Sequence, residues 1–372
     1  MTAFDDLATW RESSTSGEAI AAALNDTGAQ HAAGQALLAS AERIVITGAG
    51  SSYYLAQAAA SVARVVLRRP VIAVPLSELI LRPAGVLVAA SEPASGAGSS
   101  ARSEARRART RPIAEPIVVI SRSGSTSEAV DVAQRMRAAG HPTLAITCRG
   151  DSPLAARADV TLVSPLGDEA AIVMTRSFAS MLALLLGVVA GAGRDDRRSA
   201  DLAQVPSRWS EAVAAARVGR RLGSTDWRRI VVLGGGPAMG IALEWGLKLT
   251  ETSQVATNAY EPLEFRHGPI SVCEPGVLVV GLVGGPGAAE EVEVVEEAAR
   301  LGASTWLIAR DDDEARGTSG ELSLIGGGLD PTARLPLLLH PGHALALSLA
   351  LTRGTDPDAP RHLDQVVILG AE

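Results

Sequence analysis

The sequence is poor in cysteine, lysine and aromatic residues. Its 372 residues include two cysteines, Cys148 and Cys273, so a disulfide framework is not expected and a reducing compartment fits. Aromatic residues make up only 3 % of the chain, so any core must be built from Ala, Val, Leu and Ile. Among the 34 basic residues, Lys248 is the sole lysine. Because a compact ammonium and a guanidinium are not interchangeable, this position is a candidate for a specific role.

Several classes of partner are not expected. The formal net charge is -7 and no basic stripe occurs, which argues against nucleic-acid binding. The Arg-rich run 102–111 lies among Ser, Ala and Gly and is typical of a flexible surface loop. Residues 1–23 show no signal peptide, and the apolar segment 173–190 is interrupted by Arg176 and is shorter than the ~20 residues that span a bilayer. We therefore expect a cytoplasmic protein without a membrane partner.

Short apolar strands alternate with helices, which predicts parallel sheets covered by helices on both faces. The order of strand, Gly-rich loop and helix occurs in both halves of the chain and indicates an internal duplication. We expect a helical segment at 1–40, a first domain at 41–195, a linker or helix at 196–220 and a second domain at 221–372. The expected strands are 43–47, 71–74, 117–120, 143–147 and 160–163 in the first half, and 230–233, 277–283 and 304–309 in the second.

Two loops of the first half combine glycine with hydroxyl side chains: 48–52, Gly-Ala-Gly-Ser-Ser, and 121–126, Ser-Arg-Ser-Gly-Ser-Thr. Each follows a strand and begins a helix, so both should lie at the carboxyl edge of the sheet, where helix N-termini favour an anion. Helix capping alone would explain either loop. Two such loops in one domain favour a phosphate site, and nucleotide-binding motifs are absent. The matching loops of the second half lack hydroxyls.

Glu244, Lys248 and Glu251 have the spacing of one helix face. An exposed, salt-bridged stripe is the plain alternative, but the rest of this helix is apolar. A carboxylate in a cleft can have a raised pKa and act as a base. His267, in a loop bounded by Gly and Pro, is either an acid/base group or a surface histidine. No further ligands converge on His340 and His343, so no metal site is expected.

Four segments together resemble the family with two sugar isomerase (SIS) domains: 47–52, 121–128, 247–251 with 264–269, and 354–363. The likeness covers about residues 40–372 and implies an α/β chain of two tandem flavodoxin-like three-layer sandwiches. Segments 174–178 and 266–269 are most similar to the tagatose-6-phosphate/galactosamine-6-phosphate isomerase-deaminase branch. Glucosamine-6-phosphate synthase is a relative, but the chain has no counterpart of its glutamine-hydrolysing domain. Gln365 stands where the synthase has its Schiff-base lysine, which weighs against synthase chemistry.

The resemblance implies a role for each matching residue. Glu251 would move a proton between C1 and C2, and Lys248 would stabilise charge near O1 or C2. His267 would assist ring opening from the partner subunit of a homodimer, without metal or organic cofactor. The implied activity is amino-sugar-6-phosphate deaminase/isomerase; an aldose–ketose isomerase of another sugar phosphate or sugar–amine conjugate, and a non-catalytic sugar-phosphate sensor, remain alternatives. The implied phosphate- and substrate-binding residues are Gly50, Ser51, Ser52, Ser121, Arg122, Ser123, Thr126 and Thr175.

Overall fold

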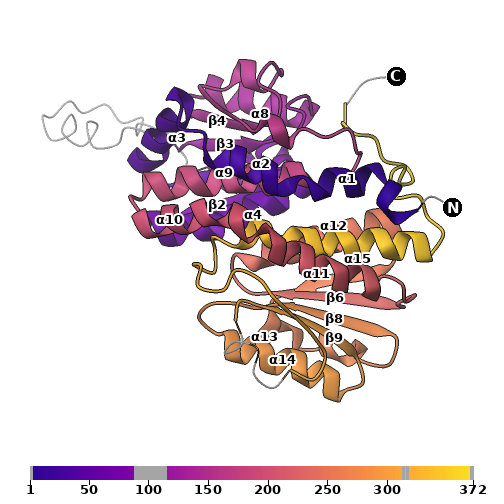
Figure 1. Cartoon of the computed structure of the whole chain (residues 1–372). Helices are drawn as coiled ribbons and strands as arrows, with labels where there is room; N and C mark the ends of the chain where they lie inside the picture. The colour runs from indigo at the N-terminus through magenta and orange to yellow at the C-terminus, as the bar shows by residue number, and fades with distance from the viewer. Residues whose placement is uncertain (1–2, 88–114, 312–314, 316–317, 369–372) are drawn as a thin grey trace, which may run out of the picture.

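The computed structural model describes residues 3–87, 115–311, 315 and 318–368, so the Arg-rich run 102–111 lies outside it. Two five-stranded parallel sheets form the frame of the molecule, in the orders β2-β1-β3-β4-β5 and β7-β6-β8-β9-β10 (Figure 1). Both have the flavodoxin-like order, in which the chain reverses direction beside its first strand. The strands are β1 (Ile44–Gly48), β2 (Val71–Pro75), β3 (Ile117–Ile120), β4 (Thr143–Thr147), β5 (Val160–Val163), β6 (Arg229–Gly234), β7 (Ala256–Tyr260), β8 (Val277–Leu282), β9 (Ser304–Ala309) and β10 (Glu321–Leu324).

Helices cover both faces of each sheet, so the expected fold class is confirmed. Helices α5 and α8 cover one face of the first sheet, and α13 and α14 cover one face of the second. On their other faces the sheets share a layer of helices that lies between them (Figure 1). The α-helices are α1 (Ala8–Ser14), α2 (Ser16–Leu24), α3 (Ala29–Ser40), α4 (Ser51–Leu67), α5 (Leu76–Leu81), α6 (Pro83–Val86), α8 (Ser127–Ala138), α9 (Arg176–Ala192), α10 (Asp196–Gln204), α11 (Trp209–Leu222), α12 (Ala238–Ser253), α13 (Pro262–Phe265), α14 (Ala288–Arg300) and α15 (Leu339–Thr352).

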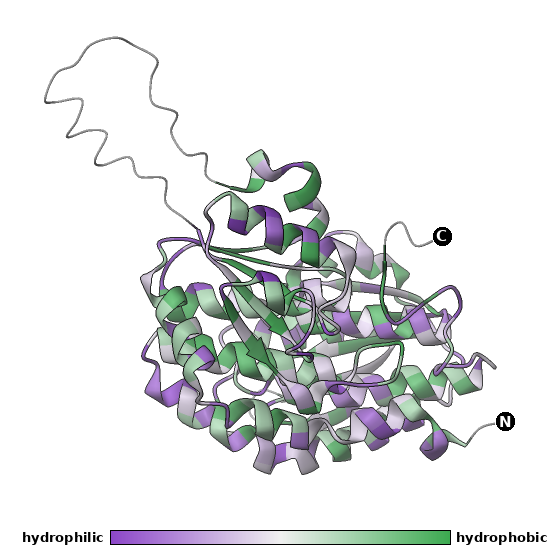
Figure 2. Ribbon diagram, turned by 90° about the horizontal axis from the view of Figure 1, so that it is seen from above, coloured by the Kyte–Doolittle hydropathy of each residue, from purple (hydrophilic) through white to green (hydrophobic). Residues whose placement is uncertain are grey.

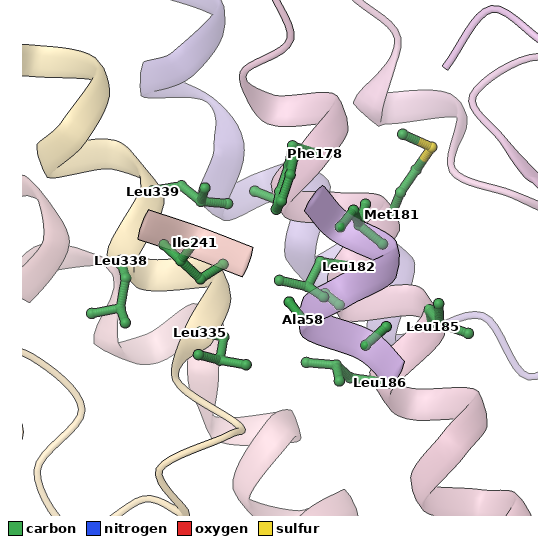
Figure 3. Close-up of a cluster of buried hydrophobic side chains, with 14 of the residues drawn as sticks. Ala58, Phe178, Met181, Leu182, Leu185, Leu186, Ile241, Leu335, Leu338 and Leu339 are labelled. Atoms are coloured by element: carbon green, nitrogen blue, oxygen red, sulfur yellow. The ribbon is translucent and has the colours of Figure 1, made fainter. Parts of the chain in front are cut away.

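The shared helical layer holds a core of aliphatic side chains that joins the two halves. Phe178, Ala58, Ile241 and Leu338 meet there from four different helices or helix ends (Figure 3). Figure 2 shows hydrophobic residues concentrated on the strands, whereas the helices carry both hydrophobic and hydrophilic residues. One described stretch, Leu335–Thr352, is long and apolar enough to cross a membrane, but 89 % of it is buried. It packs against α11 and α12 as a core helix.

Helix α12 crosses α4 at Gly240, which sets the distance between the two domains. A Cβ atom at Gly240 would lie 2.5 Å from the carbonyl oxygen of Tyr54 and 2.7 Å from the backbone nitrogen of Ala58. Glu244, Lys248 and Glu251 continue along α12 at helical spacing from Gly240. The close crossing therefore brings this charged face against the start of α4 in the first domain.

Gly240→Ala should destabilise the protein by about 1–3 kcal/mol, although Ala favours a helix, because the added methyl group overpacks a backbone contact. The matched control is Gly246→Ala on the same helix, where a Cβ would meet its nearest atom, Thr257 Cγ2, at 3.6 Å. Gly246→Ala should be neutral or stabilising by about 0.5–1 kcal/mol. Urea unfolding of both variants tests the crossing, and equal stabilities would contradict it.

Candidate active site

A cavity of about 200 Å³ opens at the carboxyl ends of β1 and β3. The chain leaves these neighbouring strands toward opposite sides of the sheet, and the resulting crevice is where open α/β sheets bind ligands. The charged side of α12 closes it from the second domain. The cavity is lined by Ala49, Gly50, Ser51, Ser52, Arg122, Ser123, Thr126, Glu128, Ile172, Val173, Met174, Lys248, Glu251, Gln365 and Val367.

Glycines shape the two hydroxyl-rich loops around this cavity. Gly50 has a φ of +53° and Gly124 a φ of +61°, conformations that side-chain-bearing residues rarely adopt. A Cβ at Gly48 would lie 2.5 Å from the backbone of Ser52, so the first turn of α4 rests on the end of β1. The loops thus present the amino ends of α4 and α8, with their hydroxyls, to one space. This arrangement suits an anion.

Glu244, Lys248 and Glu251 form a buried charged group on α12. Lys248 Nζ lies 2.6 Å from Glu251 Oε2 and 3.4 Å from Glu244 Oε1, and Ser51 Oγ donates to Glu244 Oε1 at 3.1 Å. The side chains of Glu244 and Lys248 are 1 % and 3 % exposed, whereas Glu251 is 19 % exposed and lines the cavity. The alternative of an exposed stripe is therefore wrong.

Burial shifts the proton equilibria of this group. Burial raises the pKa of Glu244, and the Lys248 ammonium opposes that rise. Burial lowers the pKa of Lys248, but the carboxylates of Glu244 and Glu251 outweigh it and the net shift is upward. Lys248 thus remains a cation at neutral pH, and Glu251 presents a carboxyl group to the cavity beside it.

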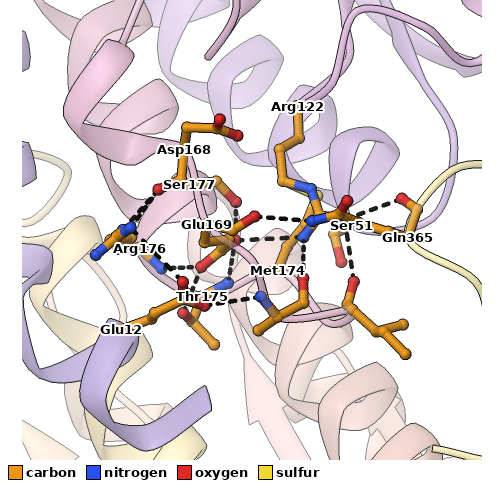
Figure 4. Close-up of polar contacts among 12 residues, drawn as sticks. Glu12, Ser51, Arg122, Asp168, Glu169, Met174, Thr175, Arg176, Ser177 and Gln365 are labelled. Atoms are coloured by element: carbon orange, nitrogen blue, oxygen red, sulfur yellow. Dashed lines mark hydrogen bonds and ion pairs between the residues drawn. The ribbon is translucent and has the colours of Figure 1, made fainter. Parts of the chain in front are cut away.

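The side chain of Arg122 runs along the wall of the cavity. Its guanidinium donates to the backbone carbonyls of Ala171, Ile172 and Gln365 and lies 3.6 Å from Glu169 (Figure 4). These contacts tie segment 171–172 and the C-terminal tail to the loop after β3. Arg122 therefore fixes the shape of the site, a role that the sequence did not suggest.

Two of the expected binding residues stand behind the lining. Ser121 is buried, with its Oγ 3.3 Å from Thr126 Oγ1. Thr175, before α9, donates to the fully buried Glu169 through its amide and its hydroxyl, at 2.9 Å and 2.6 Å (Figure 4). Sequence analysis missed Glu169, whose carboxylate also accepts from the Arg176 amide and so fixes the start of α9. The side chain of Gln365 donates to the backbone carbonyl of Glu169 at 2.8 Å.

His267 follows α13 at the surface of the second domain. It is exposed, its amide donates to the carbonyl of Glu264, and it does not line the cavity of its own chain. A single chain therefore does not bring His267 to Glu251.

His340 and His343 form a buried pair around a serine. Ser13 Oγ lies 2.8 Å from the Nδ1 atom of each ring, and the ring of Trp10 stacks on His340 at 4.7 Å. One hydroxyl can donate to only one ring, so the other ring must donate to the serine oxygen. The contact joins α1 to α15. Within the described ranges, no group of three or more His, Cys, Asp or Glu side chains is placed to hold a metal ion.

This pair should make the protein acid-sensitive. Burial lowers the pKa of His340 to about 3, and burial, aided by the nearby His340 and Lys248 side chains, lowers the pKa of His343 well below its usual value. The unfolded chain binds these protons below about pH 6.5 and the folded chain does not, so the free energy of unfolding should fall as the pH drops from 6.5 toward 3. His340 alone should account for about 2 kcal/mol at pH 5. Urea unfolding across this range should show a shallower pH slope for His340→Phe than for the parent or for a variant of the exposed His362; equal slopes would contradict this.

The chain is similar to several known proteins. The SIS domain family matches residues 113–190 and 225–319. Glutamine–fructose-6-phosphate aminotransferases (isomerizing) are 28 % identical over 270 residues in Pseudomonas aeruginosa and 29 % over 269 in Aeropyrum pernix. These alignments cover 67 % and 68 % of this chain but 43 % of each relative, so the chain matches less than half of their length.

Solved structures agree over nearly the whole chain. The C-terminal domain of the Francisella tularensis glucosamine-fructose-6-phosphate aminotransferase superimposes with a TM-score of 0.81 at 18 % identity, covering 96 % of this chain and 100 % of that domain. Tagatose-6-phosphate ketose/aldose isomerase from Escherichia coli gives 0.80 at 23 % identity, covering 100 % and 98 %. Glucosamine-6-phosphate deaminase from Thermotoga maritima gives 0.75 at 24 %, covering 97 % and 99 %. With its duplicated sheets and these matches, the chain carries a SIS domain match in each of its halves, over residues 113–190 and 225–319.

Proposed function

We propose that this protein is an amino-sugar-6-phosphate deaminase/isomerase, which converts a hexosamine 6-phosphate into a ketohexose 6-phosphate and ammonia. The observation that carries the proposal is the position of Glu251 and Lys248, which face two hydroxyl-rich helix N-termini across one cavity. Such a site can hold a phosphate at one end and move a proton at the other. We also propose a cytoplasmic location.

In this scheme the amino ends of α4 and α8, with Ser52, Ser123 and Thr126, bind the 6-phosphate. Glu251 removes the proton from C2 of the open-chain aldose and returns it to C1, through an enolamine. The Lys248 ammonium stabilises negative charge that develops at O1. The C2 amine becomes an imine, to which water adds, and the C–N bond breaks to release ammonia. Glu244 and Ser51 hold Lys248 and the start of α4 in place.

Relatives support the substrate class without deciding the reaction. Structural neighbours include a glucosamine-6-phosphate deaminase and a tagatose-6-phosphate ketose/aldose isomerase. Gln365 lies at the cavity, and an amide cannot form a Schiff base with a ketose. Isomerisation of a non-amino sugar phosphate is the second candidate, since Glu251 and Lys248 would serve it equally. A non-catalytic sensor would not need the buried charged group.

The deciding experiment follows ammonia and ketose 6-phosphate together, from glucosamine 6-phosphate and from galactosamine 6-phosphate. We expect equal amounts of both products from one epimer. Ketose formation from an aldose 6-phosphate without ammonia from either amino sugar would favour the plain isomerase. Binding without turnover of any of these would favour the sensor.

We further propose a homodimer in which His267 of one chain completes the site of the other, because His267 is exposed and does not line the cavity of its own chain. Mixing inactive Glu251→Gln chains with inactive His267→Ala chains should restore part of the activity. No recovery in a mixture shown to exchange subunits would contradict the shared site.

Replacing Ser123 and Thr126 together by Ala should weaken sugar-phosphate binding by about 10²-fold or more, because two hydrogen bonds to a charged group are lost. The matched control is Ser125→Ala in the same loop, since Ser125 does not line the cavity. Calorimetric titration with the sugar phosphate and with the unphosphorylated sugar measures the effect. Equal affinity of the parent for both sugars would contradict a phosphate site here.

A further inference from the structure

The second domain has its own cavity at the carboxyl ends of β6 and β8, with a volume of about 660 Å³. The loop that begins it, Gly234 to Pro237, repeats the backbone of the loop after β1. Gly236 has a φ of +51°, matching +53° at Gly50. A Cβ at Gly234 would lie 2.6 Å from the carbonyl oxygen of Ala238, as one at Gly48 would lie 2.6 Å from that of Ser52. The two helix N-termini are therefore formed in the same way.

The repeat extends along the helices, and here the two halves differ. Counting from the matched loops, Val65 on α4 corresponds to Glu251 on α12, and Val62 corresponds to Lys248. Val65 lines the second cavity as Glu251 lines the first. The second cavity thus has an anion-type cradle without the proton-transferring pair.

A carboxylate of the chain itself lies in this second cradle. Gly48 pairs with Pro75 in the first sheet, and Leu233 pairs with Tyr260 in the second, so Glu261 is the counterpart of Pro75. Glu261 Oε1 accepts a hydrogen bond from the Gly236 amide at 3.0 Å. In the first domain the matching Gly50 lines the open cavity, and proline offers no carboxylate.

A second carboxylate lies against the same loop. Glu291, in the first turns of α14, has its Oε1 atom 2.0 Å from where a Cβ of Gly235 would stand. Two carboxylates therefore approach the amino end of α12, a helix of 16 residues whose N-terminus favours negative charge. Phosphate would have to displace both.

We propose that the second domain keeps an anion-binding cradle and that the carboxylate of Glu261, supported by that of Glu291, fills it as an internal substitute for phosphate. The chain then binds phosphate at the first cradle only. The same contact ties the end of β7 to α12, directly before α13 and the His267 loop.

The test counts inorganic phosphate equivalents by calorimetric titration of the full chain. Glu261→Ala/Glu291→Ala should bind one equivalent more than the parent. The control is Glu264→Ala/Glu293→Ala, which removes the same charge from exposed positions on α13 and α14 and should bind as many as the parent. The test depends only on the extra equivalent of phosphate that the double variant binds. It is therefore valid whether the parent binds one phosphate, as the proposed function requires, or none.

A second measurement tests the proposal with single substitutions, in case the double variant folds poorly. Glu261→Ala alone should have a melting temperature below that of Glu261→Gln, whose amide oxygen can still accept from Gly236. Phosphate should raise the melting temperature of Glu261→Ala by several degrees more than that of Glu261→Gln or of the parent. Equal phosphate effects on all three proteins, with no extra equivalent in the double variant, would overturn the proposal.

Discussion

Glu251→Gln should lower turnover by about 10³-fold while the affinity for the sugar phosphate changes by no more than a few fold. Gln has the same shape and can still accept a hydrogen bond from Lys248, but it cannot take a proton from C2. The proposed phosphate site lies on the first domain, across the cavity from residue 251, so binding should remain. Steady-state kinetics and calorimetric titration on one preparation separate the two effects.

Two comparisons make this result specific. Glu293→Gln removes an exposed carboxylate on α14, paired only with Arg300 among its described contacts, and should leave turnover unchanged. Exchange of the C2 proton with deuterated water should stop in Glu251→Gln if Glu251 is the base. Turnover near the parent value would exclude Glu251 from proton transfer.

Lys248→Met should lower the free energy of unfolding by about 3–5 kcal/mol at pH 7, because it leaves the buried carboxyl of Glu244 without its counter-charge. Glu244 would then be held protonated, and Glu251 would lose the cation that lies 2.6 Å away. Turnover should fall as well, since the developing charge on the substrate is no longer stabilised. Urea unfolding and steady-state kinetics measure the two losses.

A second substitution separates charge from packing. Glu244→Gln/Lys248→Met removes both buried charges and should recover part of the lost stability without recovering turnover. If the free energies of unfolding are instead additive, Glu244→Gln destabilises the Lys248→Met variant as much as it destabilises the parent. The side chains of Glu244 and Lys248 would then not interact energetically, and the loss of stability in Lys248→Met would not come from breaking their ion pair.

The apolar strands could be predicted from the sequence, whereas the polar strand β7 and the elements near the C-terminus could not. Strands β3, β4, β5 and β9 lie where expected. Strands β3, β4 and β9 are almost entirely buried, and β5 is a short, mostly apolar strand at the edge of the sheet. Strand β7 was missed because it is a half-exposed edge strand with the polar sequence Ala-Thr-Asn-Ala-Tyr. Strand β10 and helix α15 were also missed. In α15, Pro341 is the third residue of the helix, and proline is tolerated in the first turn of a helix.

Part of the candidate site could likewise be predicted from local sequence spacing, and part could not. Glycine and serine spacing predicted the two loops, and helical spacing predicted the face of Glu244, Lys248 and Glu251. The bracing by Arg122 and Glu169 depends on which side chains become buried together, and local spacing does not report that. The position of Gln365 in the cavity likewise comes from a tail that returns to the first domain from the far end of the chain.

The use of arginine almost everywhere else gives Lys248 an unusual experimental value. A protein made with ¹⁵N-labelled lysine would carry one labelled side chain, buried between Glu244 and Glu251. Burial should slow the exchange of its ammonium protons with water enough for a single NMR signal to be followed. That signal would report, without a reporter group or a substitution, how substrate binding, proton transfer and subunit contact each change the charge at the centre of the site.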